Sequence, residues 1–364
     1  MISSATDARC RAPDQAFWRG KRVVVTGHTG FMGSWLVNWL ALLGARVTGL
    51  ALPPATDPAL FEVSGVAGLL EHHFAGDIRD QALVEAAFRA SEPEVVFHLA
   101  AQAIVREAFV NPLETFDVNV MGTARILEAM RHAASVRSAI VVTTDKVYDN
   151  REWEWEYREN DRLCGHEPYG SSKACAELVV EAYTRSYLSG GGIAVSTIRA
   201  GNIIGGGDWS ADRLIPDIAR SFAAGRPVSI RNPASVRPWQ HVLEPLRGYL
   251  MLAERMADAG PAQGPEAWNF GPSHLDHKPV SWIVQTCAEL WGDGASWDVQ
   301  EDNLGHESRL LALTSAKAES RLGWVPLWGL EAALDKTLGW YKAYYAGEDM
   351  REFTRRQILE LPLQ

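Results

Sequence analysis

The sequence predicts an α/β protein, in which a doubly wound parallel sheet is joined by a smaller, interleaved C-terminal α/β domain. Two observations lead to this prediction. Short β-branched runs, such as residues 21–26 and 94–101, are typical of strands buried on both faces. Helical patterns separate these runs, and a glycine-rich loop joins the first strand directly to the first helix. Such an alternation predicts a parallel sheet with ligands at the carboxyl ends of its strands.

The first strand, loop and helix form a nucleotide-binding pattern. Strand 21–26 is followed by three glycines at a fixed spacing, which are Gly27, Gly30 and Gly33. They open a helix that ends before a second strand at 46–52. A unit of this kind, about 30 residues long, is typical of the Rossmann-type fold. Its glycines allow a tight turn and let a pyrophosphate approach the backbone N–H groups at the helix start. The unit predicts a nicotinamide dinucleotide cofactor.

The second strand lacks the acid that usually holds the adenosine ribose. An Asp or Glu about 20 residues beyond the loop normally accepts this hydrogen bond, but the first acid after the strand is Asp57. No arginine follows the strand to bind a ribose phosphate, so NAD is favoured over NADP. Further along, Asp77 ends a strand and can read the adenine amino group.

Tyr169 and Lys173 lie four residues apart in a helical stretch, so their side chains share one face of the helix. A nearby ammonium favours the phenolate and lowers the pKa of a tyrosine, which suits proton transfer near neutral pH. Alone, this spacing is common on ordinary surface helices. The glycine loop and a buried strand that ends at Thr143 and Thr144 favour the catalytic interpretation. Asp145 and Lys146 follow, either as catalytic groups or as a surface ion pair.

Composition limits the partners that we expect. The net charge is −10 with no basic cluster, so neither nucleic acid nor an anionic membrane is a predicted partner. No apolar run approaches the length of a membrane span, and the first sixteen residues do not resemble a signal peptide, so we expect a cytoplasmic protein. The four cysteines are scattered without metal-ligand spacing, which predicts reduced thiols and no metal site.

Together these motifs resemble the extended short-chain dehydrogenase/reductase family. Further stretches, at 144–148, 199–209 and 237–245, resemble its nucleotide-sugar 4,6-dehydratase branch, and within that branch the subgroup acting on CDP-glucose. The likeness runs from about residue 17 to about residue 341.

The resemblance implies an NAD-dependent conversion of CDP-glucose to CDP-4-keto-6-deoxyglucose. Carbon 4 is oxidised, water is lost across carbons 5 and 6, and hydride returns to carbon 6. Tyr169 would accept the carbon-4 hydroxyl proton, while Lys173 lowers its pKa and holds the nicotinamide ribose. Thr144 would hydrogen-bond the carbon-4 oxygen. Asp145 would protonate the leaving hydroxyl, which requires that burial or a nearby negative charge keep it protonated.

Lys146 stands where many related dehydratases have a glutamate as the carbon-5 base. A neutral, desolvated lysine could take this proton. Alternatively, Lys146 stabilises the enolate and another group is the base.

The resemblance also implies two sets of binding residues. For the cofactor they are Gly27, His28, Gly30, Phe31, Met32, Gly33, Asp77, Ile78, Ala100, Ala101, Gln102, Asn119, Thr143, Tyr169 and Lys173. For the nucleotide-sugar substrate they are Arg106, Asn202, Arg213, Arg231, Arg237 and His241. His28 is either a local cap or a phosphate contact, and Asn119 would also fix the helix geometry behind the site. Arg231 and Arg237 flank a strand and turn, where they either clamp a diphosphate or satisfy loop carbonyls.

The predicted dinucleotide domain covers residues 17–200, with a return segment near 240–260, and the substrate domain covers mainly 201–364. The charged segment 150–168 is either a partly ordered cover of the site or a solvated surface loop. We expect a homodimer, or a homotetramer, that uses helices around 104–131 and 174–187.

Three alternative functions stay open at this point. A nucleotide-sugar 4-epimerase shares the threonine, tyrosine, lysine and NAD but has no need of Asp145 and Lys146. A 4,6-dehydratase for another nucleotide sugar has the same chemistry with a different base. A non-catalytic NAD-binding sensor would keep the fold without needing Tyr169.

Overall fold

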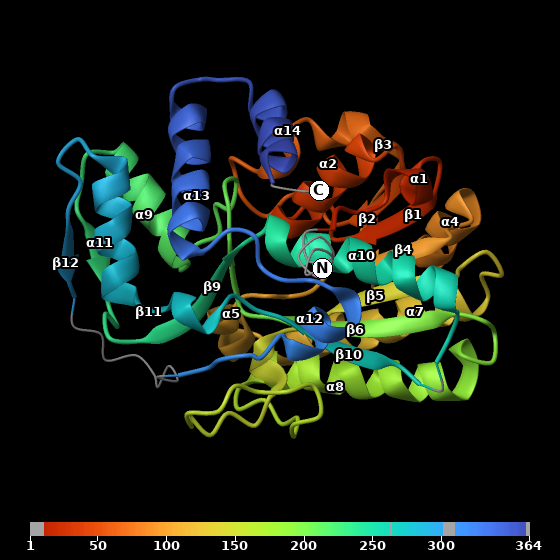
Figure 1. The fold of residues 1–364 in the computed structure, drawn as a ribbon. Helices are drawn as coiled ribbons and strands as arrows, with labels where there is room; N and C mark the ends of the chain where they lie inside the picture. Colours follow the sequence, from red (N-terminus) through yellow and green to blue (C-terminus); the bar gives the residue numbers. More distant parts are fainter. Residues whose placement is uncertain (1–10, 263, 301–309, 362–364) are drawn as a thin grey trace, which may run out of the picture.

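The computed structural model describes residues 11–262, 264–300 and 310–361, and its centre is a seven-stranded parallel sheet (Figure 1). The strand order is β10-β6-β5-β4-β1-β2-β3. The strands are β1 (Arg22–Thr26), β2 (Arg46–Ala51), β3 (Leu70–Ala75), β4 (Val95–His98), β5 (Ser138–Val142), β6 (Ala194–Ala200) and β10 (Glu266–Phe270). The order reverses between β1 and β4, which is where a doubly wound sheet opens its ligand crevice. The predicted fold class is confirmed.

Helices cover both faces of this sheet because every central strand is apolar on both sides. Alternate residues of β1 face opposite layers: Val23 and Val25 pack in one core, and Val24 packs in the other. The first layer contains α2 (Phe31–Leu42), α10 (Leu243–Ala259) and α14 (Met350–Glu360). The second contains α4 (Gln81–Ser91), α7 (Thr123–Arg131) and α8 (Pro168–Tyr183). The Tyr–Lys pair therefore lies on a helix packed against the sheet.

The remaining elements are short or lie beyond the central sheet. In the first half they are α1 (Gln15–Trp18), α3 (Leu60–Val63), η1 (Val66–Leu69), α5 (Val105–Val110), α6 (Pro112–Phe116), η2 (Asp117–Gly122), η3 (Asp145–Val147) and η4 (Thr184–Leu188). In the second half the strands are β7 (Asn202–Ile204), β8 (Val228–Ile230), β9 (Val236–His241), β11 (His277–Pro279) and β12 (Trp297–Val299). The helices there are α9 (Leu214–Ala223), η5 (His274–Asp276), α11 (Val280–Trp291), α12 (Ala316–Leu322) and α13 (Leu330–Tyr345).

The second half of the chain builds two small sheets and also returns to the first half. The small sheets have the orders β11-β9-β7 and β12-β8. The return includes α10, but also β10 at the sheet edge and α14 beside α2 (Figure 1). Interleaving is thus more extensive than a single return segment, and the division at residue 201 stays a prediction. Residues 1–10, part of the stretch that we expect not to be a signal peptide, lie outside the described residues, and so does Cys10.

The charged segment 150–168 contains neither a helix nor a strand before α8 begins, yet it is anchored. The Tyr157 N–H donates to the carbonyl of Ala312 at 2.9 Å, and the Thr314 N–H donates to the Tyr157 carbonyl at 3.1 Å. Tyr157 itself is buried and stacks on Tyr148. The segment is therefore fixed at its middle rather than being a freely solvated loop, and its role as a cover of the site stays a prediction.

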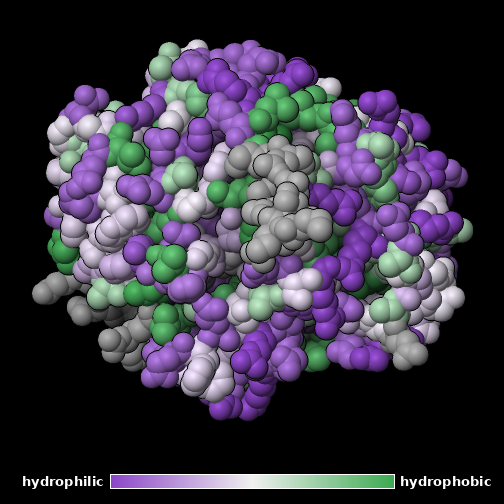
Figure 2. Space-filling view, viewed as in Figure 1, coloured by the Kyte–Doolittle hydropathy of each residue, from purple (hydrophilic) through white to green (hydrophobic). Residues whose placement is uncertain are grey.

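The surface and the helices agree with the composition. Figure 2 shows hydrophilic residues over much of one face, interrupted by smaller groups of hydrophobic residues. Among the described residues, no helix combines the length and the apolar character that crossing a membrane would require.

A buried ion pair attaches α8 to β6. The Arg199 Nε donates to Glu177 Oε1 at 2.7 Å, and both side chains are almost fully buried. Glu177 also accepts hydrogen bonds from the hydroxyls of Thr143 and Thr197. On the far side, the Arg199 guanidinium donates to the hydroxyl of Tyr148 at 2.9 Å. Because the charges satisfy each other inside the protein, removing one of them leaves the other uncompensated.

We predict that Glu177→Ala lowers the free energy of unfolding by about 3–5 kcal/mol, the cost of an unpaired buried charge. The matched control is Glu181→Ala, one turn further along α8, where Glu181 pairs with Arg185 on the surface. The control should change stability by no more than about 0.5 kcal/mol, as measured by denaturant unfolding. Equal losses in the two variants would show that the buried pair has no special role.

Candidate active site

The glycine loop is closed by contacts that leave no room for side chains. Gly27 has a positive φ of 75°, and a Cβ there would lie 2.7 Å from the backbone nitrogen of Ala100. A Cβ on Gly33 would lie 2.1 Å from the carbonyl oxygen of Gly27. In contrast, a Cβ on Gly30 would meet nothing nearer than 3.4 Å. The loop is therefore tightly packed at Gly27 and Gly33 and more open at Gly30. Helix α2 begins directly after it at Phe31 and Met32, and the free N–H groups of a helix start can bind a phosphate.

His28 is placed differently from the expected phosphate contact. Its imidazole is fully buried and packs edge-on against Phe61 and His73. A Cβ on Gly49 would lie 2.6 Å from the ring, so β2 needs a glycine there. Burial, followed by the nearby His73, lowers the pKa of His28 to about 4, and the ring is neutral at physiological pH. The side chain supports the loop from below.

The adenine end of the predicted cofactor site contains an ion pair. The Arg79 guanidinium donates to Asp77 Oδ2 at 2.6 Å, and the Arg79 N–H donates to Asp77 Oδ1 at 2.8 Å. The side-chain hydrogen bond from Arg79 is the main cause of the lowered pKa of Asp77. Ile78 is buried close to Gly122. Asp77 is held ionised as an acceptor, and its contact with adenine stays a prediction.

Asn119 acts within the protein rather than at an open surface. Its Oδ1 accepts from the Gln102 N–H at 2.9 Å, and its Nδ2 donates to the Gln102 carbonyl at 3.0 Å and to Ser172 Oγ at 2.9 Å. These bonds join the segment containing Ala100, Ala101 and Gln102 to α8. Asn119 lies in the π-helical turn η2, a local irregularity often found at functional sites. This geometry agrees with the expected role behind the site, but it departs from direct cofactor contact by the Asn119 side chain.

The catalytic candidates Thr144, Asp145 and Tyr169 meet at the carboxyl end of β5. The Thr144 hydroxyl donates to Asp145 Oδ1 at 3.0 Å, and it lies close enough to the Tyr169 phenol to lower the pKa of that phenol. Glu167 caps α8 by accepting from the N–H groups of Tyr169 and Gly170, which fixes the start of the helix. The three groups therefore lie close together, with Thr144 hydrogen-bonded to Asp145 and with both residues acting on the pKa of Tyr169.

The electrostatics of this cluster come mainly from burial. Burial raises the pKa of Asp145, against the lowering effect of Lys146 and of the Thr144 hydrogen bond. One carboxylate oxygen, Oδ2, is buried without a hydrogen-bond partner. Both facts favour a protonated carboxyl, as the predicted acid role requires.

The expectation that Lys173 lowers the pKa of Tyr169 is not met in the protein alone. Burial raises the pKa of Tyr169 to about 12, while Thr144 and Arg213 act in the opposite direction. The Lys173 ammonium donates instead to the Val142 carbonyl at 2.7 Å, and burial lowers its pKa to about 8. Tyr169 and Lys173 both lie on α8, as their spacing predicts, but the Lys173 ammonium is directed to the end of β5.

Lys146 does not have the environment that a neutral base needs. The residue is exposed, so the desolvation that would favour a neutral amine is absent from this structure. The alternative in which Lys146 only stabilises negative charge is consistent with exposure. The identity of the carbon-5 base stays open.

Arginines approach the cluster from the second half of the chain. The charge of Arg213 acts on Tyr169, and that of Arg237 acts on Asp145. Arg213 is held by Asp208 at 3.1 Å. The structure thus brings two of the predicted substrate residues to the catalytic groups.

Two further arginines converge on one acid. Arg106 contacts Asp212 Oδ1 at 2.7 Å, and Arg231 contacts the same oxygen at 3.4 Å. Asn202 lies partly exposed on β7, whose partner strand β9 carries Arg237. The sequence did not indicate Asp212, since an isolated acid in a loop has no distinguishing pattern.

His241 is a correction to the predicted substrate set. Its side chain is fully buried, with ring centroids 6.0 Å from Trp35 and 5.0 Å from Trp328. Burial lowers its pKa to about 3, and its Nδ1 accepts from the Leu243 N–H. The residue has no surface to offer a substrate because the α2 layer and residues 327–328 close over it.

The sequence analysis did not identify two supporting residues, Glu167 and Glu177, and it placed Arg199 at the crevice rather than in the buried ion pair with Glu177. Glu167 directly precedes Pro168, and an acceptor before a proline-started helix is a capping signal that was available. Glu177 lies four residues after Lys173 and so on the same helix face. Its partner on β6 could not be read from local sequence, because only the tertiary fold brings the two together.

A doubly wound sheet, a tight glycine loop and a Thr–Asp–Tyr cluster at its crevice define a nucleotide-dependent enzyme of the extended short-chain dehydrogenase type. The sequence pattern of the NAD dependent epimerase/dehydratase family matches residues 23–271, and the chain belongs to this family.

Individual relatives are consistent with this membership. The chain is 49% identical over 350 residues to a CDP-glucose 4,6-dehydratase of Salmonella typhimurium, covering 95% of this chain and 97% of the relative. It is 29% identical over 338 residues to a dTDP-glucose 4,6-dehydratase of Xanthomonas campestris pv. campestris, covering 87% and 92%. The fold is similar to the crystal structure of a dTDP-glucose 4,6-dehydratase from Bacillus anthracis, with a TM-score of 0.75, 22% identity, and coverage of 90% and 99%.

The raised pKa of Asp145 predicts a pH-dependent stability. The folded protein holds this proton more tightly than the unfolded chain, so the carboxyl costs stability as pH rises above its ordinary pKa of 3.8. Asp145→Asn should therefore match the parent near pH 4 and become the more stable of the two as the pH rises to neutrality.

Denaturant unfolding across this range measures the difference. Asp77→Asn is the control of opposite sign, since the pKa of Asp77 is lowered by Arg79 and its charge stabilises the fold above that pKa. An Asp145→Asn variant that loses stability at neutral pH would contradict the buried, protonated carboxyl.

Proposed function

We propose that this protein is an NAD-dependent CDP-glucose 4,6-dehydratase, a hydro-lyase. The observation that carries the proposal is the contact of Thr144 with both Tyr169 and the buried Asp145. This arrangement supplies an acid for a leaving hydroxyl beside a group for carbon-4 proton transfer. The 49% identity to a CDP-glucose 4,6-dehydratase supports the choice of substrate.

The glycine loop fits a dinucleotide. Gly27 and Gly33 occupy places that a Cβ would fill, and the start of α2 presents backbone N–H groups to a pyrophosphate. Gly30, Phe31 and Met32 would border this approach. The family is described as NAD dependent. Bound NAD would supply the hydride chemistry, which is removal of hydride from sugar carbon 4 and its later return to carbon 6.

The residues of this chain supply the proton chemistry. Tyr169 takes up the proton of the carbon-4 hydroxyl as its phenolate, a form that the bound substrate and cofactor would have to favour because burial alone raises its pKa. Thr144 orients both the sugar oxygen and the Asp145 carboxyl. Once carbon 4 is a ketone, the carbon-5 proton is acidic enough to be removed. Asp145 then gives its proton to the departing carbon-6 hydroxyl, which leaves as water. Burial keeps Asp145 protonated until that step.

The protein has a net charge of −10, so arginines at the site would supply the positive charge that binds a diphosphate. Planar guanidinium groups bind diphosphate oxygens in pairs. Arg106 and Arg231, which share Asp212, and Arg213 and Arg237, which face the catalytic groups, would hold the nucleotide diphosphate between them. In this proposal Arg106 and Arg231 exchange their contacts with Asp212 for contacts with the diphosphate of the substrate.

A 4-epimerase is the second candidate, because it shares the threonine, tyrosine and lysine. The buried, protonated Asp145 disfavours it, since epimerisation expels no hydroxyl and has no use for this acid. A non-catalytic NAD-binding sensor is disfavoured because Thr144 and the buried Asp145 both lie close to Tyr169.

The test is turnover of CDP-glucose with NAD, followed by the mass of the product. We expect the loss of one water and a 4-keto product that absorbs strongly in alkali, with much slower reaction of dTDP-glucose and GDP-glucose. An unchanged mass with an altered sugar would indicate an epimerase.

Tyr169→Phe should reduce kcat by about 10²–10⁴-fold, whereas Tyr183→Phe, at the far end of α8, should not. Full activity of Tyr169→Phe would refute the assigned role.

We also propose that the protein forms a homodimer through the outer face of α5, α6, η2, α8 and η4. These elements pack on one another and expose large apolar side chains, which are Phe109, Val110, Leu113, Met121, Leu178 and Tyr187. Leu113 is 85% exposed and Leu178 is 60% exposed. A group of this kind on one face is typical of a protein–protein interface.

The dimer proposal is tested by charge on this face. The double substitution of Leu113 and Leu178 by Asp should convert the dimer to a monomer in light scattering with an unchanged circular dichroism spectrum. Leu359→Asp is the matched control, because Leu359 is 67% exposed on α14 instead. A double variant that stays dimeric would place the interface elsewhere.

A further inference from the structure

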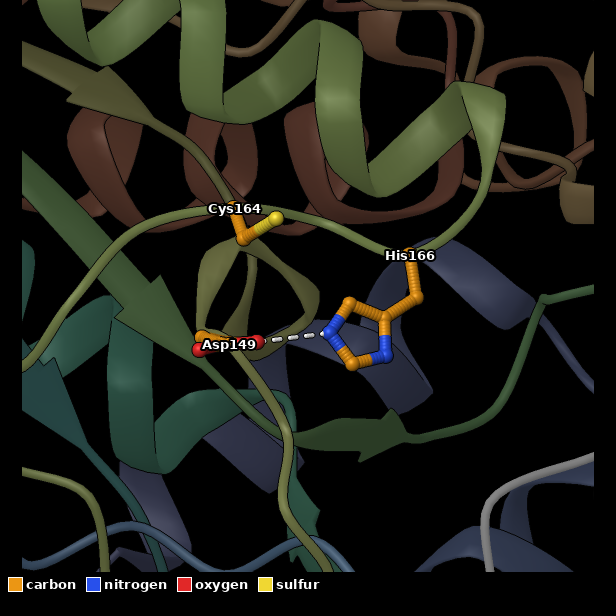
Figure 3. A group of neighbouring side chains, drawn as sticks. All are labelled: Asp149, Cys164 and His166. Carbon is orange, nitrogen blue, oxygen red and sulfur yellow. Dashed lines mark hydrogen bonds and ion pairs between the residues drawn. The ribbon is translucent and has the colours of Figure 1, made fainter.

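One group of side chains in the described residues has the geometry of a metal site, although the sequence predicted none. Asp149, Cys164 and His166 each offer a ligand atom, and these atoms all lie within 4.8 Å of one another (Figure 3). The carboxylate of Asp149 directly precedes the charged segment 150–168, and the sulfur and imidazole of Cys164 and His166 lie near the C-terminal end of that segment. Cysteine spacing alone could not indicate this group, because it contains a single cysteine.

Local pairing of the backbone brings these residues together. The Asp149 N–H donates to the Arg162 carbonyl at 2.9 Å, and the Cys164 N–H donates to the Val147 carbonyl at 2.9 Å. Between them, Tyr148 and Leu163 form an antiparallel bridge. The group is therefore held on a paired ladder at the base of the cover.

The turn before α8 fixes the third ligand. Gly165 has a positive φ of 66°, and a Cβ there would lie 2.3 Å from the Ser171 nitrogen, so the chain is packed against the helix. The Ser171 hydroxyl donates to the Gly165 carbonyl at 3.0 Å. His166 follows directly, and its Nε2 lies 2.8 Å from Asp149 Oδ1.

We propose that Asp149, Cys164 and His166 form a binding site for Zn²⁺ or a similar borderline-soft divalent cation. Thiolate, imidazole and carboxylate are the ligands that Zn²⁺ prefers, and three protein ligands leave one tetrahedral position open to water. Binding forms the Zn–S bond as the thiol loses its proton to solvent. The neutral imidazole coordinates through Nε2 and keeps its proton on Nδ1.

The neighbouring cations do not block this site. Arg151 and Arg162 each approach Asp149 at 3.5 Å, but both contact Oδ2, whereas His166 contacts Oδ1. Their side chains are 57% and 71% exposed, so these contacts are weak and readily displaced.

A bound ion would connect the segments that lead to the two catalytic positions. Asp149 lies four residues after Asp145, and His166 lies three residues before Tyr169. The bound ion would therefore connect the start and the end of the charged segment 150–168. This inference depends only on the geometry of the three ligands and not on the proposed reaction.

The test uses the full-length protein, freed of metal by a chelator, with Cys10 replaced by Ser in every sample to simplify thiol labelling. Titration with Zn²⁺ should show one equivalent bound and should protect Cys164 from alkylation. Titration with Co²⁺ should produce a thiolate-to-cobalt charge-transfer band in the near ultraviolet. Thermal unfolding before metal addition establishes that each variant is folded.

Cys164→Ser should abolish the cobalt band, and His166→Ala should weaken Zn²⁺ binding by about 10–100-fold or more, since even partners outside the ligand set can cost this much. His132→Ala is the matched control: His132 contacts Glu128 at 3.0 Å in a similar exposed pair. Equal Zn²⁺ affinity in the parent and in folded Cys164→Ser, or alkylation of Cys164 unaffected by Zn²⁺, would overturn the proposal.

Discussion

The hydrogen bond between Thr144 and a buried Asp145 is the interaction on which the rest of the site depends. A carboxyl at this depth is stable only if it keeps its proton or finds a strong partner. Here it has one neutral hydroxyl as a side-chain partner and one oxygen without any. Burial therefore favours the protonated form of Asp145. Thr144, which is hydrogen-bonded to Asp145, also lies close to the phenol of Tyr169.

The surrounding structure holds this cluster in place from three sides. Glu167 fixes the first turn of α8, Glu177 attaches the middle of that helix to β6 through Arg199, and Asn119 connects it to the segment after β4. Each of these three polar side chains has its hydrogen-bond partners inside the protein. Such networks define one arrangement of a core more strongly than apolar packing alone. The position of Tyr169 is thus set by residues outside the proposed catalytic group.

The fold could be predicted from sequence because its signals are local. β-branched runs, the spacing of Gly27, Gly30 and Gly33, and the spacing of Tyr169 and Lys173 are all readable within a few residues. Side-chain direction was less predictable. Lys173 points to a strand carbonyl, His241 lies between two tryptophans, and Lys146 is exposed, because each outcome depends on residues distant in sequence. The Asp149–Cys164–His166 group was invisible for the same reason.

The central claim is that Asp145 is protonated at neutral pH inside the folded protein, and infrared difference spectroscopy tests it most directly. The spectrum of the parent minus that of Asp145→Asn isolates this carboxyl from the other buried acids. The account predicts a protonated carboxyl C=O band at neutral pH that is lost in the variant. A carboxylate band in its place would contradict the account.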